Sequence, residues 1–295
     1  MSIWNMQMNV TVKSFYHAPS GTASYLVVEP ATKSAVIIDS VLGFDVASGE
    51  LSYTFADELL AYLQAQDLNL VWILDTHAHA DHLTAAHYLH QKTGVPTAIG
   101  SGIAKSQAHF ETTFYHHGVG GGKHAGFDIL LDDGAVLPFG EESVQVLATP
   151  GHTPDSVSYL IGANVFVGDT LFMPDAGTAR CDFPGGDAAV LWHSIEKIHR
   201  LPAATTIWVC HDYQPNGREL KLNTTVAESK RSNIHVAHVS KQDYVNLRNS
   251  RDSTLNAPAL LYPSLQVNLW GGALPQKEQN GQRYIKIPLS QQRKD

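Results

Sequence analysis

The chain has 295 residues, of which 43% are hydrophobic, and a formal net charge of −8. This length favours one domain with an extension or two unequal domains. The acidic balance excludes the basic face that a nucleic acid or an acidic membrane would require, so neither partner is expected. Two cysteines provide no disulfide framework, and no apolar run approaches the roughly 18 residues of a membrane span. These features, together with the lack of a secretory signal, predict a soluble cytoplasmic protein.

The first third of the chain alternates short strands with turns and then with helices. Stretches rich in β-branched and aromatic residues predict strands over 10–17, 23–29, 34–39, 70–75 and 95–100. The spacing of Leu59, Leu60 and Leu63 predicts a helix over 54–66. A second helix is expected over 82–94, ending at Gly94 as a cap.

The rest of the chain predicts strands over 144–151, 156–162, 164–169 and 205–213, with an amphipathic helix over 187–201. From about residue 241 the sequence becomes polar and irregular, and it ends in a stretch rich in proline and glycine. We therefore expect a catalytic domain over residues 1–240 and a C-terminal segment, 241–295, packed on it. The order of elements predicts an α+β fold, a sandwich with helices covering the outer faces of its sheets.

Metal-capable side chains follow the ends of several predicted strands. The peptide THAHADH places four of them within six positions, directly after an apolar strand, and three more follow later strands. Strand ends in layered α/β folds share one edge, where ligands bind. A structural histidine or a helix cap explains any one of these residues, but not the whole set. The sequence predicts one metal site formed by His77, His79, Asp81, His82, His152, Asp169 and His211, with Asp81 and His82 aimed by the start of a helix.

The motifs THAHADH, TPGHT, VGDTLF and VCHDY occur in this order. Across residues 10 to 235 the chain resembles the metallo-β-lactamase superfamily. The resemblance implies an αββα four-layer sandwich with a metal site at one edge. It also implies that Asp39 supports this site without binding the metal.

The stretch VGDTLFMPDAGTARCDFPGGD resembles the persulfide dioxygenases of this superfamily, as does the tail after residue 241. This resemblance implies one Fe(2+) per chain, held by His77, His152 and Asp169. It also implies an enzyme that oxidises glutathione persulfide with O2 and water to sulfite and glutathione. A homodimer is expected too, as is common among such relatives.

The other ligand-capable residues leave two interpretations open. In the dioxygenases, residues matching His79, Asp81, His82 and His211 are outer-shell groups that orient ligands and water. In the alternative, a binuclear zinc hydrolase of the glyoxalase II type, they hold a second metal and the substrate is a glutathione thioester.

Substrate contacts are expected from Arg180, Tyr213 and Arg218. Arg180 matches the basic residue that takes a glutathione carboxylate in the related families, and a guanidinium suits this bidentate contact. Cys181 is expected to be a small core residue. The glycine-rich peptide over 118–124 lacks the features of a phosphate-binding loop and predicts an ordinary loop.

Overall fold

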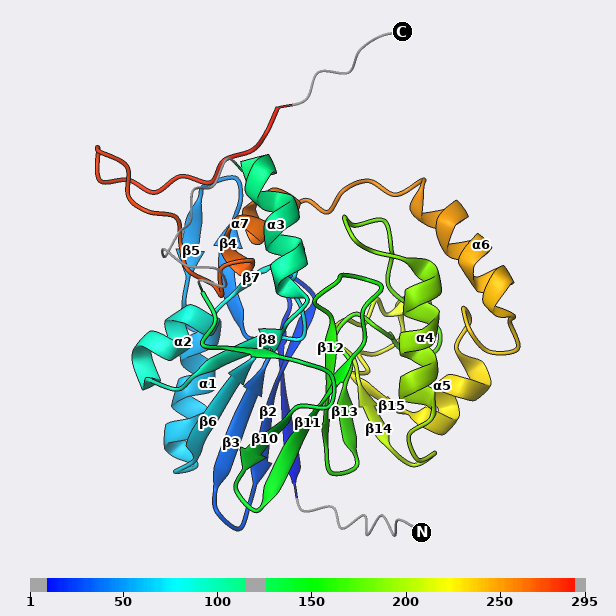
Figure 1. Ribbon diagram of the computed structural model, residues 1–295. Helices are drawn as coiled ribbons and strands as arrows, with labels where there is room; N and C mark the ends of the chain where they lie inside the picture. Colours follow the sequence, from blue (N-terminus) through cyan, green and yellow to red (C-terminus); the bar gives the residue numbers. More distant parts are fainter. Residues whose placement is uncertain (1–9, 115–125, 290–295) are drawn as a thin grey trace, which may run out of the picture.

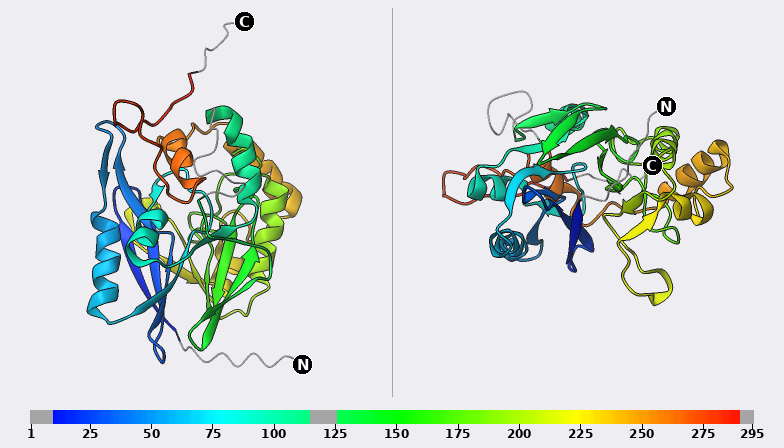
Figure 2. Two further views of the ribbon diagram at one scale, coloured as in Figure 1. Left: turned by 60° about the vertical axis from the view of Figure 1, so that its left-hand side comes forward. Right: turned by 90° about the horizontal axis from the view of Figure 1, so that it is seen from below.

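The computed structural model describes residues 10–114 and 126–289, and its strands form two main sheets that face each other (Figures 1 and 2). The first sheet has the order β1-β2-β3-β6-β8-β9, and the second has the order β10-β11-β12-β13-β14-β15. The strands of the first are Thr11–His17, Thr22–Glu29, Ser34–Ile38, Asn69–Leu74, Thr97–Gly100 and Ile129–Leu131. Those of the second are Val136–Phe139, Glu142–Ala148, Val157–Ile161, Asn164–Phe166, Thr206–Trp208 and Asn223–Thr225.

Helices cover both outer faces of the two sheets. α1 (Thr54–Ala65) and α2 (Ala86–Thr93) pack on the first sheet, while α4 (Ala188–His199), α5 (Val226–Ser232) and α6 (Lys241–Asp252) lie on the side of the second (Figure 1). The inner faces of the sheets meet in one apolar core, which includes Tyr25, Val146 and Tyr159. The predicted αββα sandwich is therefore confirmed.

A small third sheet lies near the edge that carries the metal-capable residues. It has the order β5-β4-β7, with strands Glu50–Ser52, Val41–Asp45 and Leu83–Thr84. β7 corrects one prediction, because α2 begins at Ala86 and not at residue 82. Asp81 and His82 therefore lie in a loop before β7. Pairing of Leu83 and Thr84 with β4 holds these residues extended, so the helix cannot start there.

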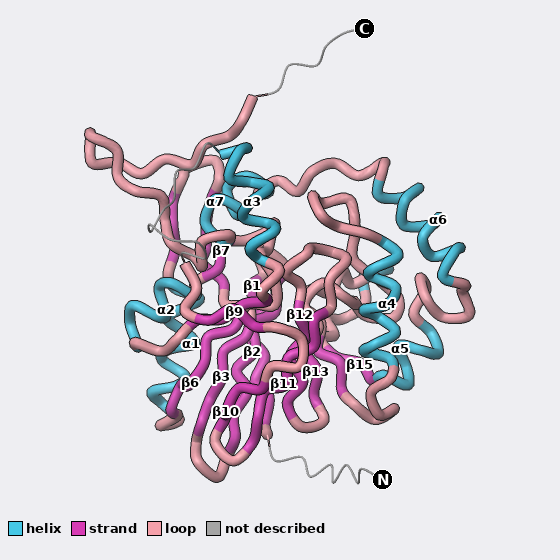
Figure 3. The backbone as a smooth tube through the Cα atoms, in the orientation of Figure 1, coloured by secondary structure: helices cyan, strands magenta, loops and turns pink. Residues whose placement is uncertain are grey.

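The C-terminal segment is more regular than the sequence predicts. It contains α6, which packs against α4, and α7 (Leu261–Asn268), which packs against β7. The chain between these helices crosses the molecule as a loop (Figure 3). The remaining described helices are α3 (Ile103–Phe114) and the short η1 (Pro215–Gly217). No described helix combines the length and apolar character needed to cross a bilayer.

Candidate metal centre

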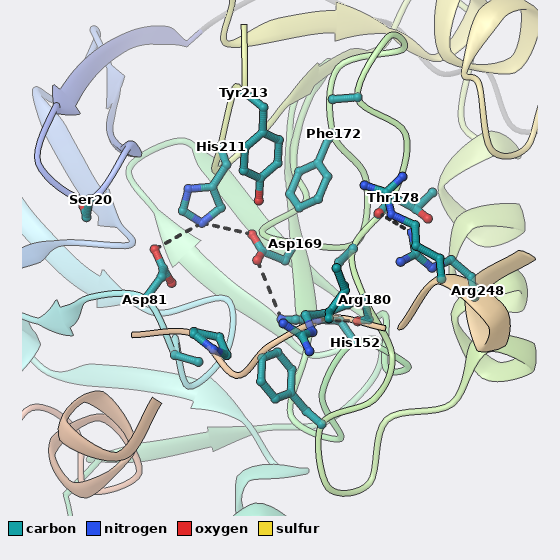
Figure 4. A pocket seen from close by; sticks show the side chains of 17 residues that line it. Ser20, Asp81, His152, Asp169, Phe172, Thr178, Arg180, His211, Tyr213 and Arg248 are labelled. Atoms are coloured by element: carbon teal, nitrogen blue, oxygen red, sulfur yellow. Dashed lines mark hydrogen bonds and ion pairs between the residues drawn. The ribbon is translucent and has the colours of Figure 1, made fainter. Parts of the chain in front are cut away.

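The metal-capable side chains come from loops that follow the ends of separate strands. β6 leads to His77, β11 to His152, β13 to Asp169 and β14 to His211. β13 and β14 are parallel, so the residues that follow them emerge at the same edge. Figure 4 shows Asp169 between His152 on one side and His211 on the other. The predicted convergence of these distant segments is present in the structure.

Three of the side chains form a compact group of two imidazoles and one carboxylate. Candidate ligand atoms of His77, His152 and Asp169 all lie within 4.8 Å of one another. Asp169 Oδ2 is 3.9 Å from His77 Nε2 and 3.7 Å from His152 Nε2. One ion placed among these atoms would have ligands on one side and open positions on the other.

Hydrogen bonds from the far side of each ring aim the two imidazoles of this group. The Thr76 hydroxyl donates to Asp39 Oδ2 at 3.0 Å, so it accepts from His77 Nδ1, also at 3.0 Å. His152 Nδ1 donates to the Arg180 carbonyl at 2.7 Å. Each bond puts the ring proton on Nδ1 and leaves the Nε2 lone pair for a metal, the usual arrangement for a histidine ligand.

A second group lies on the other side of Asp169. Candidate ligand atoms of His79, Asp81 and His82 are mutually within 4.8 Å. His211 Nε2 lies 3.4 Å from both Asp81 Oδ2 and Asp169 Oδ1, while His211 Nδ1 donates to the Gly21 carbonyl at 2.9 Å. Asp169 thus stands between the two groups, within reach of an ion in either one.

The residues fit a bound cation. His77 Nε2, His79 Nδ1, His82 Nε2 and Asp169 Oδ1 are buried and have no hydrogen-bond partner among the described residues. Buried polar atoms without partners are rare because each one costs free energy. Four such atoms, divided between the two adjacent groups, indicate that this edge of the sandwich binds metal. The chemistry of this donor set, imidazole nitrogen and carboxylate oxygen, suits zinc or iron.

Two histidines of the site, His77 and His211, differ in charge. Burial, followed by the neighbouring His79, lowers the pKa of His77 well below its usual value. The ring is thus neutral and able to bind metal. Burial also opposes charge on His211, but the carboxylates of Asp169 and Asp81 outweigh it and raise the pKa of His211 to about 9. The metal-free His211 ring therefore carries a proton near neutral pH, which a metal at this position would displace.

Asp39 supports the loop behind the ligands, in the role that the sequence resemblance implies. Its Oδ1 accepts from the Thr76 main-chain N–H at 2.7 Å and from His79 Nε2 at 3.1 Å. The residue directly follows β3 and has a φ of 55°, in the left-handed region that aspartate tolerates better than most residues. Asp39 therefore fixes the His79 ring with Nδ1 facing the site.

A cavity of about 390 Å³ opens over the metal-capable residues. His152, Asp169 and His211 reach it, and its walls include Phe172, Phe183 and Tyr213 (Figure 4). The C-terminal segment contributes the far wall through Arg248, Arg251, Leu255 and Pro258. A small ligand can therefore reach the ligand cluster from solvent, between aromatic walls and cationic side chains.

The structure distinguishes among the three predicted substrate contacts. Tyr213 lines the cavity and is 65% exposed. Arg180 also lines it, but three of its five N–H groups already donate to Asp182 and to the Asn256 carbonyl. Arg218 does not belong to the cavity lining, because its guanidinium binds Asp175 and Asp212. The prediction for Arg218 thus finds no support in its position.

Two other predictions concern residues outside the ligand cluster. Cys181 packs in the core beneath α4, and burial raises the pKa of its thiol to about 12. This agrees with the expectation of an inert core residue. The glycine-rich peptide over 118–124 lies outside the described residues.

Several supporting residues escape prediction from the sequence. Asp155 accepts from the Ala78 N–H at 2.6 Å, directly beside His77. Arg248, 2% exposed, donates to the Thr178 carbonyl at 3.0 Å, and Asp252 accepts from the Cys181 N–H at 2.7 Å. The last two contacts hold the segment whose Arg180 carbonyl orients His152. Their partners are main-chain atoms, which no side-chain motif reveals.

Comparison with known proteins agrees with this fold and site. The model of the Metallo-beta-lactamase superfamily matches residues 17–211. A probable metallo-hydrolase of Burkholderia pseudomallei is 45% identical over 291 residues, covering 95% of this chain and 99% of that protein. Glyoxylase B2 of Dictyostelium discoideum is 44% identical over 288 residues, covering 97% and 99%.

Persulfide dioxygenases are more distant relatives. The human mitochondrial persulfide dioxygenase ETHE1 is 28% identical over 207 residues, 69% of each chain. The crystal structure of ETHE1 from Myxococcus xanthus superposes with a TM-score of 0.71 and 30% identity, covering 89% of this chain and all of that one. The fold and the ligand cluster define a metal-dependent enzyme, and the chain belongs to the metallo-beta-lactamase superfamily.

Proposed function

We propose that the protein is a glutathione persulfide dioxygenase that uses one Fe(2+) per chain. The group formed by His77, His152 and Asp169, of which the last two line the cavity, carries this proposal. Two imidazoles and a carboxylate on one face are typical of non-haem iron oxygenases. The likeness to persulfide dioxygenases, at 28% and 30% identity, supports the same reaction class.

The reaction converts a persulfide, O2 and water to a thiol and sulfite. The outer sulfur loses four electrons and O2 gains four, so no further oxidant is required. The sulfur–sulfur bond breaks, and glutathione leaves with a proton on its thiol. Fe(2+) bound at this site would supply the redox chemistry for O2 activation, which zinc does not offer.

The protein's own residues bind and orient the substrate. Arg180 keeps two N–H groups beyond those bonded to Asp182 and Asn256, and these can take a carboxylate of glutathione. Its guanidinium lies 5.2 Å from the centre of the Phe183 ring, which is itself in edge contact with His152. Phe183 and Phe172 thus give the cavity wall apolar surface beside the cationic side chains.

A two-zinc hydrolase acting on a glutathione thioester is the second candidate. The observation that favours it is the second group, in which His79, Asp81 and His82 cluster and His211 lies 3.4 Å from Asp81. Within the described residues, His79 Nδ1 and His82 Nε2 have no hydrogen-bond partner. The 44% identity to a protein named Glyoxylase B2 points the same way.

Oxygen uptake with glutathione persulfide, run beside thioester hydrolysis on the same preparation, separates the two. The proposal predicts that one O2 is consumed per sulfite formed, and that thioester hydrolysis is slow by comparison. Thioester turnover without oxygen uptake would overturn it in favour of the hydrolase.

A further inference from the structure

We infer that Asn268, in the C-terminal segment, is a positioning residue for the loop His79–His82, which carries the second group of metal-capable side chains. Asn268 is the last residue of α7 and is 1% exposed. Its Nδ2 donates to the main-chain carbonyls of His79 and His82, each at 2.7 Å, and its Oδ1 accepts from the Thr84 N–H at 2.8 Å. One side chain thus joins both ends of the loop to the strand that follows.

The partners fix the orientation of this amide. Two carbonyls require donors and one N–H requires an acceptor, so only one assignment of oxygen and nitrogen satisfies all three. In the described parts of the chain, no other hydrogen bond reaches the main chain of residues 79–82. The main chain of the loop is therefore held by Asn268, whereas the strands on either side, β6 and β7, are held by pairing with other strands.

The residues next to Asn268 are anchored in two apolar clusters. Val267 packs in the core beneath the first sheet, while Leu265 and Leu269 pack in the core around α3. Gly272, at a φ of 89°, brings the turn after α7 against Thr84, where a Cβ would lie only 3.0 Å from the Thr84 carbonyl oxygen. With apolar anchors on both sides, Asn268 cannot follow the loop, so the loop must conform to Asn268.

The hydrogen bonds of Asn268 affect the direction in which the His79 and His82 side chains point. The bonds to His79 and His82 set the main chain from which two imidazoles reach toward the ligand cluster. Among residues 10–114 and 126–289, His79 Nδ1 and His82 Nε2 find no hydrogen-bond partner. This inference depends on the site holding a metal, but not on whether that metal is iron or zinc. In the dioxygenase the loop acts on the metal through the second group of side chains, and in the hydrolase it carries metal ligands itself.

Metal binding to the full-length, metal-free protein tests the inference, with Co²⁺ as the probe. Asn268→Asp preserves the shape but points an oxygen at two carbonyls, and Asn268→Ala removes the amide. Asn249→Asp is the matched control, because Asn249 is an exposed asparagine of the same C-terminal segment. Chelator competition gives the affinity, and the visible absorption of Co²⁺ reports the ligand geometry.

We expect both Asn268 variants to bind Co²⁺ about 10- to 100-fold more weakly and with an altered spectrum, since outer-shell changes typically cost that much. The control should match the wild type. Folded variants with unchanged affinity and spectrum but a lower melting temperature would overturn the inference. So would variants that fail to fold with or without metal, because Asn268 would then hold the fold instead of the loop. Oxygen uptake by the wild type is a separate result and does not affect this one.

Discussion

The two ligand groups share Asp169 but are held in different ways. In the first group, His77 and His152 are each oriented by a neutral partner behind the ring, Thr76 Oγ1 or the Arg180 carbonyl. In the second group the side chains bind one another, as His82 Nδ1 lies 3.2 Å and His211 Nε2 3.4 Å from the same Asp81 oxygen.

This difference indicates that the two groups have different roles in metal binding. The first group is preorganised to receive an ion, because its partners leave both Nε2 lone pairs free. The second group is partly charge-compensated without any ion, since the protonated His211 ring lies 3.4 Å from the carboxylates of both Asp169 and Asp81. We therefore expect the first group to bind the ion and the second to orient ligands and water around it.

Replacing Asp169 should have the largest effect, because this residue lies within reach of both groups. Asp169→Ala is expected to lose both metal and activity. Metal analysis of the purified variant checks this, with Asp175→Ala as a control carboxylate that binds Arg218 away from the cluster. Retention of a full metal complement in Asp169→Ala would contradict the ligand assignment.

Single alanine substitutions in each group test directly whether the two groups have different roles. His77→Ala and His152→Ala should lose the iron. His82→Ala and His211→Ala should retain much of it and lose rate by about 10- to 100-fold, the usual cost of outer-shell changes. Iron content and initial oxygen uptake measure both properties. Equal loss of metal in all four variants would indicate a binuclear site.

Substitution of Arg180 tests the proposed contact between its guanidinium and a carboxylate of glutathione. Loss of a charge-assisted contact costs roughly 1.5–3 kcal/mol, or about ten- to a hundred-fold in kcat/KM. If the contact is equal in the ground and transition states, Arg180→Ala raises KM more than it lowers kcat. Arg231→Ala is the control, because Arg231 is an arginine with a 74% exposed side chain, paired with Glu228 away from the cavity.

A small persulfide without carboxylates serves as the control substrate in the Arg180 experiment. It should be oxidised equally by the wild type and by Arg180→Ala. An equal penalty for both substrates, or loss of iron from the variant, would mean that Arg180 acts through its structural bonds to Asp182 and Asn256.

A further prediction concerns the stability of the metal-free protein, which does not depend on activity. The folded pKa of His211, about 9, lies above its ordinary value of 6.5. Its contribution to the free energy of unfolding is therefore complete below about pH 6.5 and is lost as pH rises through 9. The full shift corresponds to roughly 3 kcal/mol as an upper bound. Urea unfolding at both pH values should show a larger loss for the wild type than for His211→Asn, and equal losses would contradict this electrostatic picture.

The convergence of the metal-capable side chains can be predicted from the sequence, because His77, His152, Asp169 and His211 each follow an apolar strand and neighbouring strand ends share an edge. The sandwich follows from the same alternation of strands and helices. The sequence does not predict α6, because its inward face carries Tyr244, Arg248 and Asp252 at helical spacing. Hydrophobic periodicity cannot reveal a helix whose buried face is largely polar.

The supporting contacts are hidden for a related reason. Asn268 contacts main-chain atoms almost two hundred positions away in the sequence, and an asparagine near a helix end resembles an ordinary cap or turn residue. The start of α2 is displaced because pairing of β7 with β4 overrides local helix preference. Both the partners of Asn268 and the start of α2 are determined by tertiary contacts, which local sequence patterns do not contain.

Titration of the metal-free protein with Fe(2+) under anaerobic conditions tests the central claim most directly. Samples at each loading are given glutathione persulfide and air, and the initial rate of oxygen uptake is measured. The account predicts a rate that rises linearly to one iron per chain and then stays level, with Asp169→Ala inactive throughout. Absence of oxygen uptake at every iron loading, with thioester hydrolysis that peaks at two zinc ions per chain, would contradict it.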